Sequence, residues 1–318
     1  MSRKLIALPL IATLMGSTAF ADAPKVAVDI APVHSLVARV MDGVGHPDLI
    51  VKPGASPHEY SLRPSEASAL QNAGLVFWIG ADLTPWMEKT IETLASQAAV
   101  TALLEANGTI ELEFREGALF EAHGHDEHED HEDDNAHDDH DNHEGHDHGA
   151  HDPHAWLSPQ NAMTWLNVIA AQLSAADPEN AGTYFTNAAA GRSEIEGLIA
   201  EVKATLEPVK DGQFIVFHDA YQYFETDFDF FAAGAISLSD ASDPSPARLV
   251  EIQERIAKER IDCVLAEPQF NPGLVATVLD GTQAQTGTLD PLGSDLEPGA
   301  TLYPQLIRNL ATALSDCM

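Results

Sequence analysis

Two series of short apolar runs, alternating with helical patterns, constrain this chain most strongly. The first series extends from KVAVDIAPV to AVTALLE, and the second from QFIVFHDA, through FDFFAAGAI, to the C-terminus. A continuous apolar run such as LVFWIG is typical of a strand buried on both faces, and strands that alternate with helices favour parallel sheets. The 318 residues are enough for two domains. We therefore expect an α/β protein with two parallel-sheet lobes, in which FDFFAAGAI forms a strand.

A nearly unbroken helical sequence, residues 178–209, separates the two series. At 1.5 Å per residue, a helix of about 30 residues would be about 45 Å long. We interpret it as a rigid connector. The expected organisation is an N-terminal α/β lobe at 22–177, the connecting helix at 178–209 and a C-terminal α/β lobe at 210–318.

The N-terminus has the three parts of a secretory signal peptide. Arg3 and Lys4 precede an apolar run that is too short for a membrane span, and small residues follow it. We predict that residues 1–21 are removed by cleavage after Ala21, and cleavage after Ala23 is the alternative. The mature protein would then be exported and soluble.

A segment at about 121–151, called the His/Asp-rich segment below, combines histidines and acidic residues and lacks large aliphatic ones. Such a composition cannot bury enough apolar surface to fold by itself, so we predict a disordered loop inserted in the first lobe. Because the loop has no preorganised ligand set, we expect it to bind several metal ions weakly. Its secondary ligands would be His123, His125, His128, His131, His137, His140, His143, His146, His148 and His151.

The formal net charge of −34 is concentrated around this segment, because no lysine or arginine lies between Arg115 and Arg192. Nucleic acid is therefore excluded as a partner, since phosphate contacts need clustered basic residues. A metal cation is the more natural partner, and the acidic segment would raise its local concentration. We expect the segment to aid metal capture, delivery or sensing; the alternative is a solvated spacer.

The chain has two cysteines, Cys263 and Cys317. In an oxidising compartment, a pair at such a long separation indicates one disulfide that ties down the C-terminus. The alternative is two unpaired, buried thiols. Neither cysteine has the spacing of a zinc knuckle or of a redox CxxC motif.

Three histidines and an aspartate, far apart in the sequence, come from both expected lobes and could converge on the cleft between them. His58 follows the DLIVKP run, His218 ends the IVF run and Asp290 follows the TGT run. Open α/β sheets bind ligands at these ends, and His154 precedes a helix start in DPHAWLSP. Three imidazoles with one oxygen would suit Zn²⁺. The alternative is that these histidines are ordinary surface or core residues.

Five motifs carry a resemblance to a known family. In chain order, GASPHEYSLRPSEASALQNAGLVFWIG, DPHAWLSP, FHDAYQYFE, LAEPQFNP and TLDPLG resemble the ZnuA family, the zinc-binding periplasmic components of bacterial ABC importers. The same cluster includes manganese-binding relatives. The resemblance covers nearly the whole mature chain. It implies two α/β lobes joined by a long helix, a metal in the interlobe cleft, and a disulfide between Cys263 and Cys317.

The resemblance also implies a ligand set. His58, His154 and His218 would be the principal zinc ligands, and a histidine instead of a carboxylate at position 218 favours zinc over manganese. The chain departs from some members in having Pro57 where they have a glutamate before the first ligand. The fourth ligand is therefore either Asp290 or water.

The function implied by the resemblance is transport, not catalysis. We expect a periplasmic protein that captures zinc between its lobes and delivers it to a membrane ABC permease. Its partners would be Zn²⁺, this permease and a periplasmic zinc chaperone, and we expect a monomer. One alternative is a secreted zinc hydrolase, although the sequence has no HExxH motif and no obvious nucleophile elbow. The other is a zinc buffer or chaperone that acts mainly through the His/Asp-rich segment.

Overall fold

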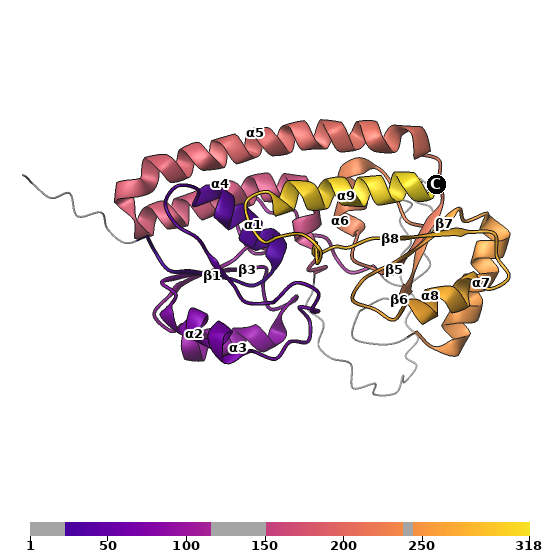
Figure 1. Cartoon of the computed structure of the whole chain (residues 1–318), viewed down its shortest axis with the longest axis horizontal. Helices are drawn as coiled ribbons and strands as arrows, with labels where there is room; N and C mark the ends of the chain where they lie inside the picture. Colours follow the sequence, from indigo (N-terminus) through magenta and orange to yellow (C-terminus); the bar gives the residue numbers. More distant parts are fainter. Residues whose placement is uncertain (1–22, 116–150, 238–243) are drawn as a thin grey trace, which may run out of the picture.

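Two α/β lobes lie side by side under one long helix, α5 (Ala181–Leu206), in the computed structural model of the chain (Figure 1). The structure describes residues 23–115, 151–237 and 244–318. The predicted signal peptide and the His/Asp-rich segment up to residue 150 lie outside the described residues. None of the described helices is long and apolar enough to cross a membrane.

The first lobe is built on a parallel sheet with the strand order β2-β1-β3-β4. Its strands are β1 (Val26–Val28), β2 (Asp48–Leu49), β3 (Leu75–Trp78) and β4 (Ala99–Ala102). Every residue of β1 and β3 is buried, so both faces of the sheet must be covered. One face packs against α2 (Pro64–Asn72) and α3 (Pro85–Leu94), and the other against α1 (Ala31–Val40) and α4 (Pro159–Ala176).

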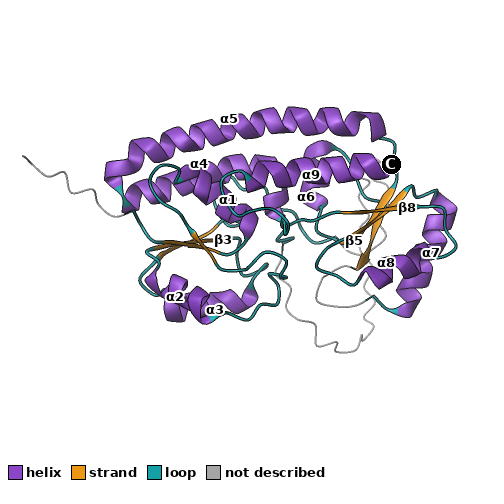
Figure 2. Ribbon diagram, in the orientation of Figure 1, coloured by secondary structure: helices purple, strands orange, loops and turns teal. Residues whose placement is uncertain are grey.

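The second lobe repeats this arrangement with the strand order β6-β5-β7-β8, again parallel. Its strands are β5 (Phe214–His218), β6 (Gly234–Ser237), β7 (Cys263–Ala266) and β8 (Gln285–Thr288). Helices α7 (Pro246–Glu259) and α8 (Pro272–Leu279) cover one face, and α6 (Gln222–Phe228) and α9 (Leu302–Cys317) pack against the other. Figure 2 shows the two sheets as separate groups of strands.

One strand prediction is partly wrong. The run FDFFAAGAI was expected to be a single strand, but α6 extends to Phe228 and β6 starts only at Gly234. Asp229 ends α6 in the left-handed conformation, with φ at 52°, and this turns the chain away from the helix. The apolar side chains after it are mostly buried because they pack in the core, and not because they form a strand.

The predicted connecting helix is present. Helix α5 spans 26 residues and has a short 3₁₀ turn at each end. It is therefore about 39 Å long at 1.5 Å per residue. Its buried residues recur every three or four positions, at Tyr184, Ala188, Gly191, Ile195, Leu198, Val202 and Leu206. This stripe packs on the helices of both lobes, α1 and α4 in the first and α9 in the second.

Close helix packing depends on the glycine in this stripe. A Cβ atom at Gly191 would come within 3.1 Å of the Leu166 Cδ1 atom and 3.2 Å of the Arg39 Cγ atom. These contacts are tighter than normal van der Waals contacts, so a larger residue would push α5 away from α4 and α1. The connector therefore rests firmly on the first lobe.

The predicted disulfide is confirmed, and the alternative of two unpaired thiols is wrong. Cys263, at the start of β7, is bonded to Cys317 at the end of α9. The bond fixes the C-terminal helix to the centre of the second sheet.

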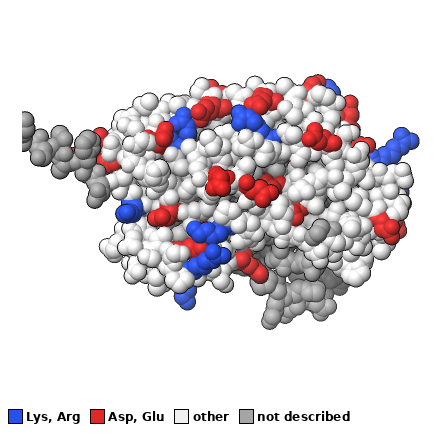
Figure 3. All heavy atoms as spheres, in the orientation of Figure 1, with Lys and Arg blue, Asp and Glu red and all other residues white. Residues whose placement is uncertain are grey.

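Acidic and basic side chains are interspersed on the face in Figure 3, which carries no broad patch of one sign among the described residues.

Candidate metal centre

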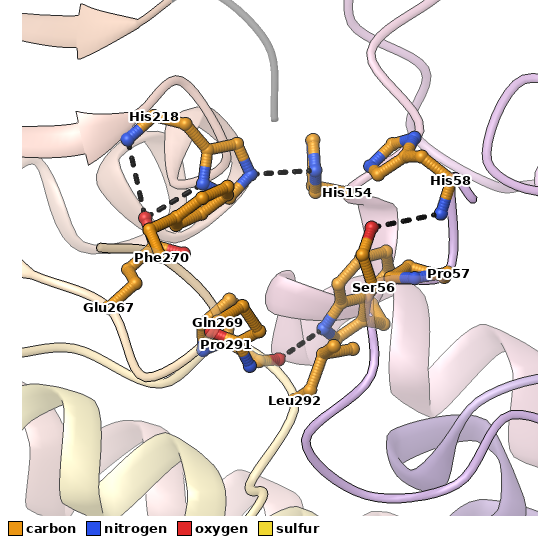
Figure 4. A pocket seen from close by; sticks show the side chains of 11 residues that line it. Ser56, Pro57, His58, His154, His218, Glu267, Gln269, Phe270, Pro291 and Leu292 are labelled. Carbon is orange, nitrogen blue, oxygen red and sulfur yellow. Dashed lines mark hydrogen bonds and ion pairs between the residues drawn. The ribbon is translucent and has the colours of Figure 1, made fainter. Parts of the chain in front are cut away.

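Three histidines from the two lobes face one another where the lobes meet (Figure 4). His218 is the last residue of β5, His58 lies in the loop that follows β2, and His154 directly precedes the 3₁₀ turn Ala155–Leu157. His154 and His218 are only 5% and 4% exposed, and His58 is half-buried. The structure thus brings together three residues that lie far apart in the sequence.

The spacing of the two buried histidines matches that of zinc ligands. Their Nε2 atoms are 3.3 Å apart. Two nitrogen ligands of a tetrahedral zinc ion, each about 2.0–2.1 Å from the metal, are separated by about 3.3–3.4 Å. The distance between these two Nε2 atoms is therefore compatible with two ligands of one tetrahedral zinc ion.

The His58 ring lies slightly further out. Its centroid is 5.6 Å from that of His154, whereas the centroids of His154 and His218 are 5.2 Å apart. Across the ranges that the structure describes, no group of three His, Cys, Asp or Glu side chains is gathered closely enough to hold a metal ion. The described arrangement is a preformed pair of ligands with a third candidate next to it.

A carboxylate holds the second ring nitrogen of each buried histidine. The Nδ1 atom of His154 lies 2.7 Å from Oδ1 of Asp152, and Nδ1 of His218 lies 2.7 Å from Oε1 of Glu267. An ionised carboxylate only accepts hydrogen bonds, so each Nδ1 donates and each Nε2 has a lone pair. Carboxylates orient histidine ligands in this way around zinc ions.

The two lone pairs then face each other across the 3.3 Å gap between the Nε2 atoms. Two acceptors at this distance repel unless a positive charge lies between them. A single proton between the two Nε2 atoms forms one N–H···N hydrogen bond, whereas a divalent cation can coordinate both nitrogens. Zinc and protons therefore compete for this pair.

The carboxylates behind the histidines are themselves removed from water. Burial raises the pKa of Asp152 to about 7, although the hydrogen bond from the His154 backbone and the charge of Arg115 lower it. A cation bound at the histidines would favour its ionised form.

The walls of the pocket are mostly apolar. The ring of Phe270 meets that of His218 edge-on at 5.4 Å, and the ring of Trp156 lies 5.2 Å from that of His154. Trp156 also joins the lobes, because its Nε1 atom donates a hydrogen bond of 2.7 Å to the Pro291 carbonyl. The full lining is Ser56, Pro57, His58, His154, Trp156, His218, Glu267, Gln269, Phe270, Pro291 and Leu292.

Asp290, which with water was one of two candidates for the fourth ligand, makes hydrogen bonds within its own loop. Its Oδ1 atom accepts hydrogen bonds of 3.0 Å from the backbone of Leu292 and Gly293, and one of 3.2 Å from Gln269. Its Oδ2 atom accepts a hydrogen bond from the Ser294 backbone. The carboxylate thus caps its own loop and does not line the pocket.

The sequence reasoning missed the carboxylates that orient the histidines. Asp152 precedes His154 by two residues, a spacing that allows a local contact. Glu267 directly follows β7, which pairs in parallel with β5. The carboxyl ends of paired parallel strands meet at one edge of the sheet, and this signal could have placed Glu267 beside His218.

Of the predicted secondary ligands, only His151 belongs to the described residues. Its Nε2 atom lies 3.6 Å from Oε2 of Glu111, and its side chain is 38% exposed. It does not line the pocket. The other nine, from His123 to His148, lie outside the described residues.

The fold is similar to that of solved metal-binding proteins. A structure titled "Crystal structure of ZnuA" matches with a TM-score of 0.73 and 22% identity, covering 93% of this chain and 99% of that chain. A second, the solute-binding protein FpvC of Pseudomonas aeruginosa in complex with Mn²⁺, matches with a TM-score of 0.74 and 19% identity, covering 93% and 98%. At these identities, the two matches establish the fold.

The sequence comparisons establish the family. The family model described as "Zinc-uptake complex component A periplasmic" matches residues 26–317. The high-affinity zinc uptake system protein ZnuA of Brucella abortus (strain 2308) is 50% identical over 319 residues, which cover 97% of this chain and 96% of that protein. The protein of the same description from Paracoccus denitrificans is 44% identical, with 97% of each chain covered. The chain therefore belongs to the ZnuA family of periplasmic zinc-uptake components, whose members are solute-binding proteins and not enzymes.

Proposed function

We propose that this protein captures Zn²⁺ between its lobes with His58, His154 and His218 and delivers it to the membrane permease of an ABC importer. The observation that carries the proposal is the pair of buried imidazoles. Their Nε2 atoms face each other at 3.3 Å, and carboxylates hold both Nδ1 atoms. A site of this kind needs little rearrangement to bind a cation.

His58 is the third ligand in this proposal. It is half-buried and belongs to a loop, whereas His154 and His218 are buried. A short movement of this loop would bring its ring to the third corner of the tetrahedron. His58 then closes the site behind the metal and opens it for release. The fourth corner would be filled by water, or by Asp290 after it releases the amides of its own loop.

The ligand chemistry favours zinc over manganese or magnesium. Three neutral imidazoles suit a borderline-soft ion in tetrahedral geometry, whereas harder ions prefer carboxylate, carbonyl and water oxygens. The two carboxylates in contact with the histidine rings hold the Nδ1 atoms and leave the Nε2 atoms for a metal. The family relatives are named for zinc uptake, which agrees with this choice.

The remaining parts of the proposal concern export and capture. Residues 1–21 would direct the chain to the periplasm, where it would act as a monomer. The His/Asp-rich segment would bind further zinc ions weakly and raise the local cation concentration. A periplasmic zinc chaperone is a further candidate partner. A loop-only zinc buffer is the competing function, and it makes the histidine pocket dispensable.

A chelator-competition titration of the metal-free mature protein tests the proposal. His154→Ala and His218→Ala should each weaken tight zinc binding by orders of magnitude, because a ligand and its geometry are lost together. His46→Ala is the matched control, since His46 is exposed and lies in the loop before β2; its affinity should equal that of the wild type. Wild-type affinity in His218→Ala would refute the assignment and favour the loop-only buffer.

A further inference from the structure

A buried cluster of charged side chains joins the two lobes next to the histidines. It consists of Arg115 from the first lobe and of Asp219 and Glu225 from the second, and is called the Arg115 cluster below. The side chains are 14%, 7% and 1% exposed. Charges so far from water are kept only where partners and hydrogen bonds compensate the lost hydration.

The guanidinium of Arg115 binds both carboxylates at once. Its Nε atom donates to both oxygens of Asp219 at 3.0 Å, and its Nη2 atom also donates to Asp219. Its Nη1 atom donates to Oε2 of Glu225 at 2.7 Å, and Nη2 reaches Oε1 at 3.3 Å. Such fork-shaped pairing fixes direction as well as distance, which the single ammonium group of a lysine cannot do.

On each lobe, the Arg115 cluster is connected through the backbone to one of the buried histidines. On the second lobe, Asp219 directly follows His218, and Glu225 belongs to α6. On the first lobe, the residues just before Arg115 run beside the chain leading to His154. The Leu112 carbonyl in this segment accepts a hydrogen bond of 2.8 Å from the Asp152 backbone.

A tyrosine of the second lobe also links the two segments of the first lobe to α6. The hydroxyl of Tyr223, on α6, accepts a hydrogen bond of 2.9 Å from the Leu112 backbone and donates one of 2.9 Å to the Asp152 carbonyl. Asp152 in turn orients the His154 ring. The segment that carries Arg115 and the segment that carries His154 are therefore both held against α6.

We propose that Arg115 is a positioning residue for the zinc site: by clamping Asp219 and Glu225, it holds the two histidine-bearing segments at the spacing that zinc requires. This inference rests on the proposed function, because it assumes that zinc binds at His154 and His218. Arg115 does not line the pocket itself and acts through the backbone next to His218. Without the clamp, the 3.3 Å separation of the Nε2 atoms would no longer be fixed.

The first test uses Arg115→Lys and Arg115→Gln in the full mature protein. Changes in residues that orient zinc ligands reduce metal affinity about 10–100-fold, and we expect a loss of this size for both variants. Arg39→Gln is the control, because Arg39 also makes a two-point ion pair, with Glu194, but on the connecting helix away from the site. The readouts are zinc affinity by chelator competition and the visible spectrum of bound Co²⁺, which reports ligand geometry.

A second variant separates positioning from charge compensation. Arg115→Gln alone leaves two buried carboxylates unpaired and could unfold the protein. The triple variant Arg115→Gln, Asp219→Asn, Glu225→Gln removes all three charges, and the two former carboxylates keep their shapes. If positioning is the role, the triple variant folds but still binds zinc about 10–100-fold more weakly, with an altered Co²⁺ spectrum.

Two results would overturn the inference. Wild-type zinc affinity in Arg115→Lys would show that only the positive charge is needed, and wild-type affinity in the triple variant would show that only charge balance matters. Failure of the proposed function gives a different result. In that case, either the wild-type protein and Arg39→Gln would lack tight zinc binding, or tight zinc binding would persist in the His218→Ala variant.

Discussion

Replacing Glu267 with glutamine removes the charge behind His218 and keeps a hydrogen-bond acceptor of the same shape. Glu267 is 1% exposed, and its Oε1 atom lies 2.7 Å from Nδ1 of His218 and 3.3 Å from the backbone nitrogen of the same residue. The amide oxygen of glutamine can accept the same hydrogen bonds. The ring should therefore keep its orientation and tautomer, while its Nε2 atom becomes a weaker zinc ligand.

The expected loss follows from the kind of hydrogen bond that changes. A hydrogen bond to a charged group contributes about 1.5–3 kcal/mol and a neutral one about 1 kcal/mol. The difference, about 0.5–2 kcal/mol, corresponds to about 2–30-fold in Kd at 1.4 kcal/mol per tenfold change. Removing a negative charge near a dication adds to this effect in the same direction.

The assay is zinc competition against a chelator of known affinity, at constant pH and ionic strength. Glu59→Gln serves as the control, because Glu59 neighbours His58 in sequence but is exposed. Glu267→Gln should bind zinc more weakly than both the wild type and this control. An affinity within about twofold of the wild type would show that the Glu267 charge does not tune the site, and the tautomer argument would then fail for His218.

Three further predictions concern pH and the His/Asp-rich segment. Zinc affinity should fall as the pH drops below about 6, because protons compete for imidazoles, whose ordinary pKa is near 6.5; an affinity constant down to about pH 5 would argue against imidazole ligands. Burial raises the pKa of Asp29 to about 7, so between about pH 4 and pH 7 the folded protein binds more protons than the unfolded chain. Zinc-free protein should therefore lose stability as the pH rises through this window, and denaturant unfolding at pH 5 and pH 8 should show a smaller difference for Asp29→Asn. Deleting residues 123–149 should leave one tight zinc ion and remove the weaker ones, and capture should slow most at low ionic strength; calorimetry and association kinetics at two salt concentrations check this, and loss of the tight ion would show that the segment is the primary site.

The broad fold could be predicted from the sequence because its signals are local. Buried parallel strands appear as continuous apolar runs such as that of β3, and the stripe of α5 repeats at helical spacing. The limit is shown by the run that ends in β6. Its apolar side chains are buried for packing, and a single left-handed residue at Asp229 decides where the helix ends. The apolar composition of this run does not indicate where the helix ends and the strand begins.

The site could be predicted in part. His58 follows β2 and His218 ends β5, and open α/β sheets bind ligands at the carboxyl ends of strands, so both histidines could be singled out from the sequence. Because β2 and β5 belong to different sheets, the convergence of the two histidines depends on how the lobes pack. The role of Asp290 could not be predicted from the sequence, because its carboxylate can accept hydrogen bonds from the amides of its own loop or coordinate a metal. In this structure it accepts the local hydrogen bonds. The Arg115 cluster is set by the packing of α6 between the lobes, which no local pattern in the sequence encodes.

X-ray absorption at the zinc edge tests the central claim most directly. The measurement should use protein without residues 123–149, loaded with one equivalent of zinc, so that only the interlobe site contributes. Our account predicts about three nitrogen ligands at about 2.0–2.1 Å with the outer-shell scattering of imidazole rings, and one oxygen. The His218→Ala form should lose one imidazole. A shell made mostly of oxygen, with at most one imidazole, would contradict a site built on His58, His154 and His218.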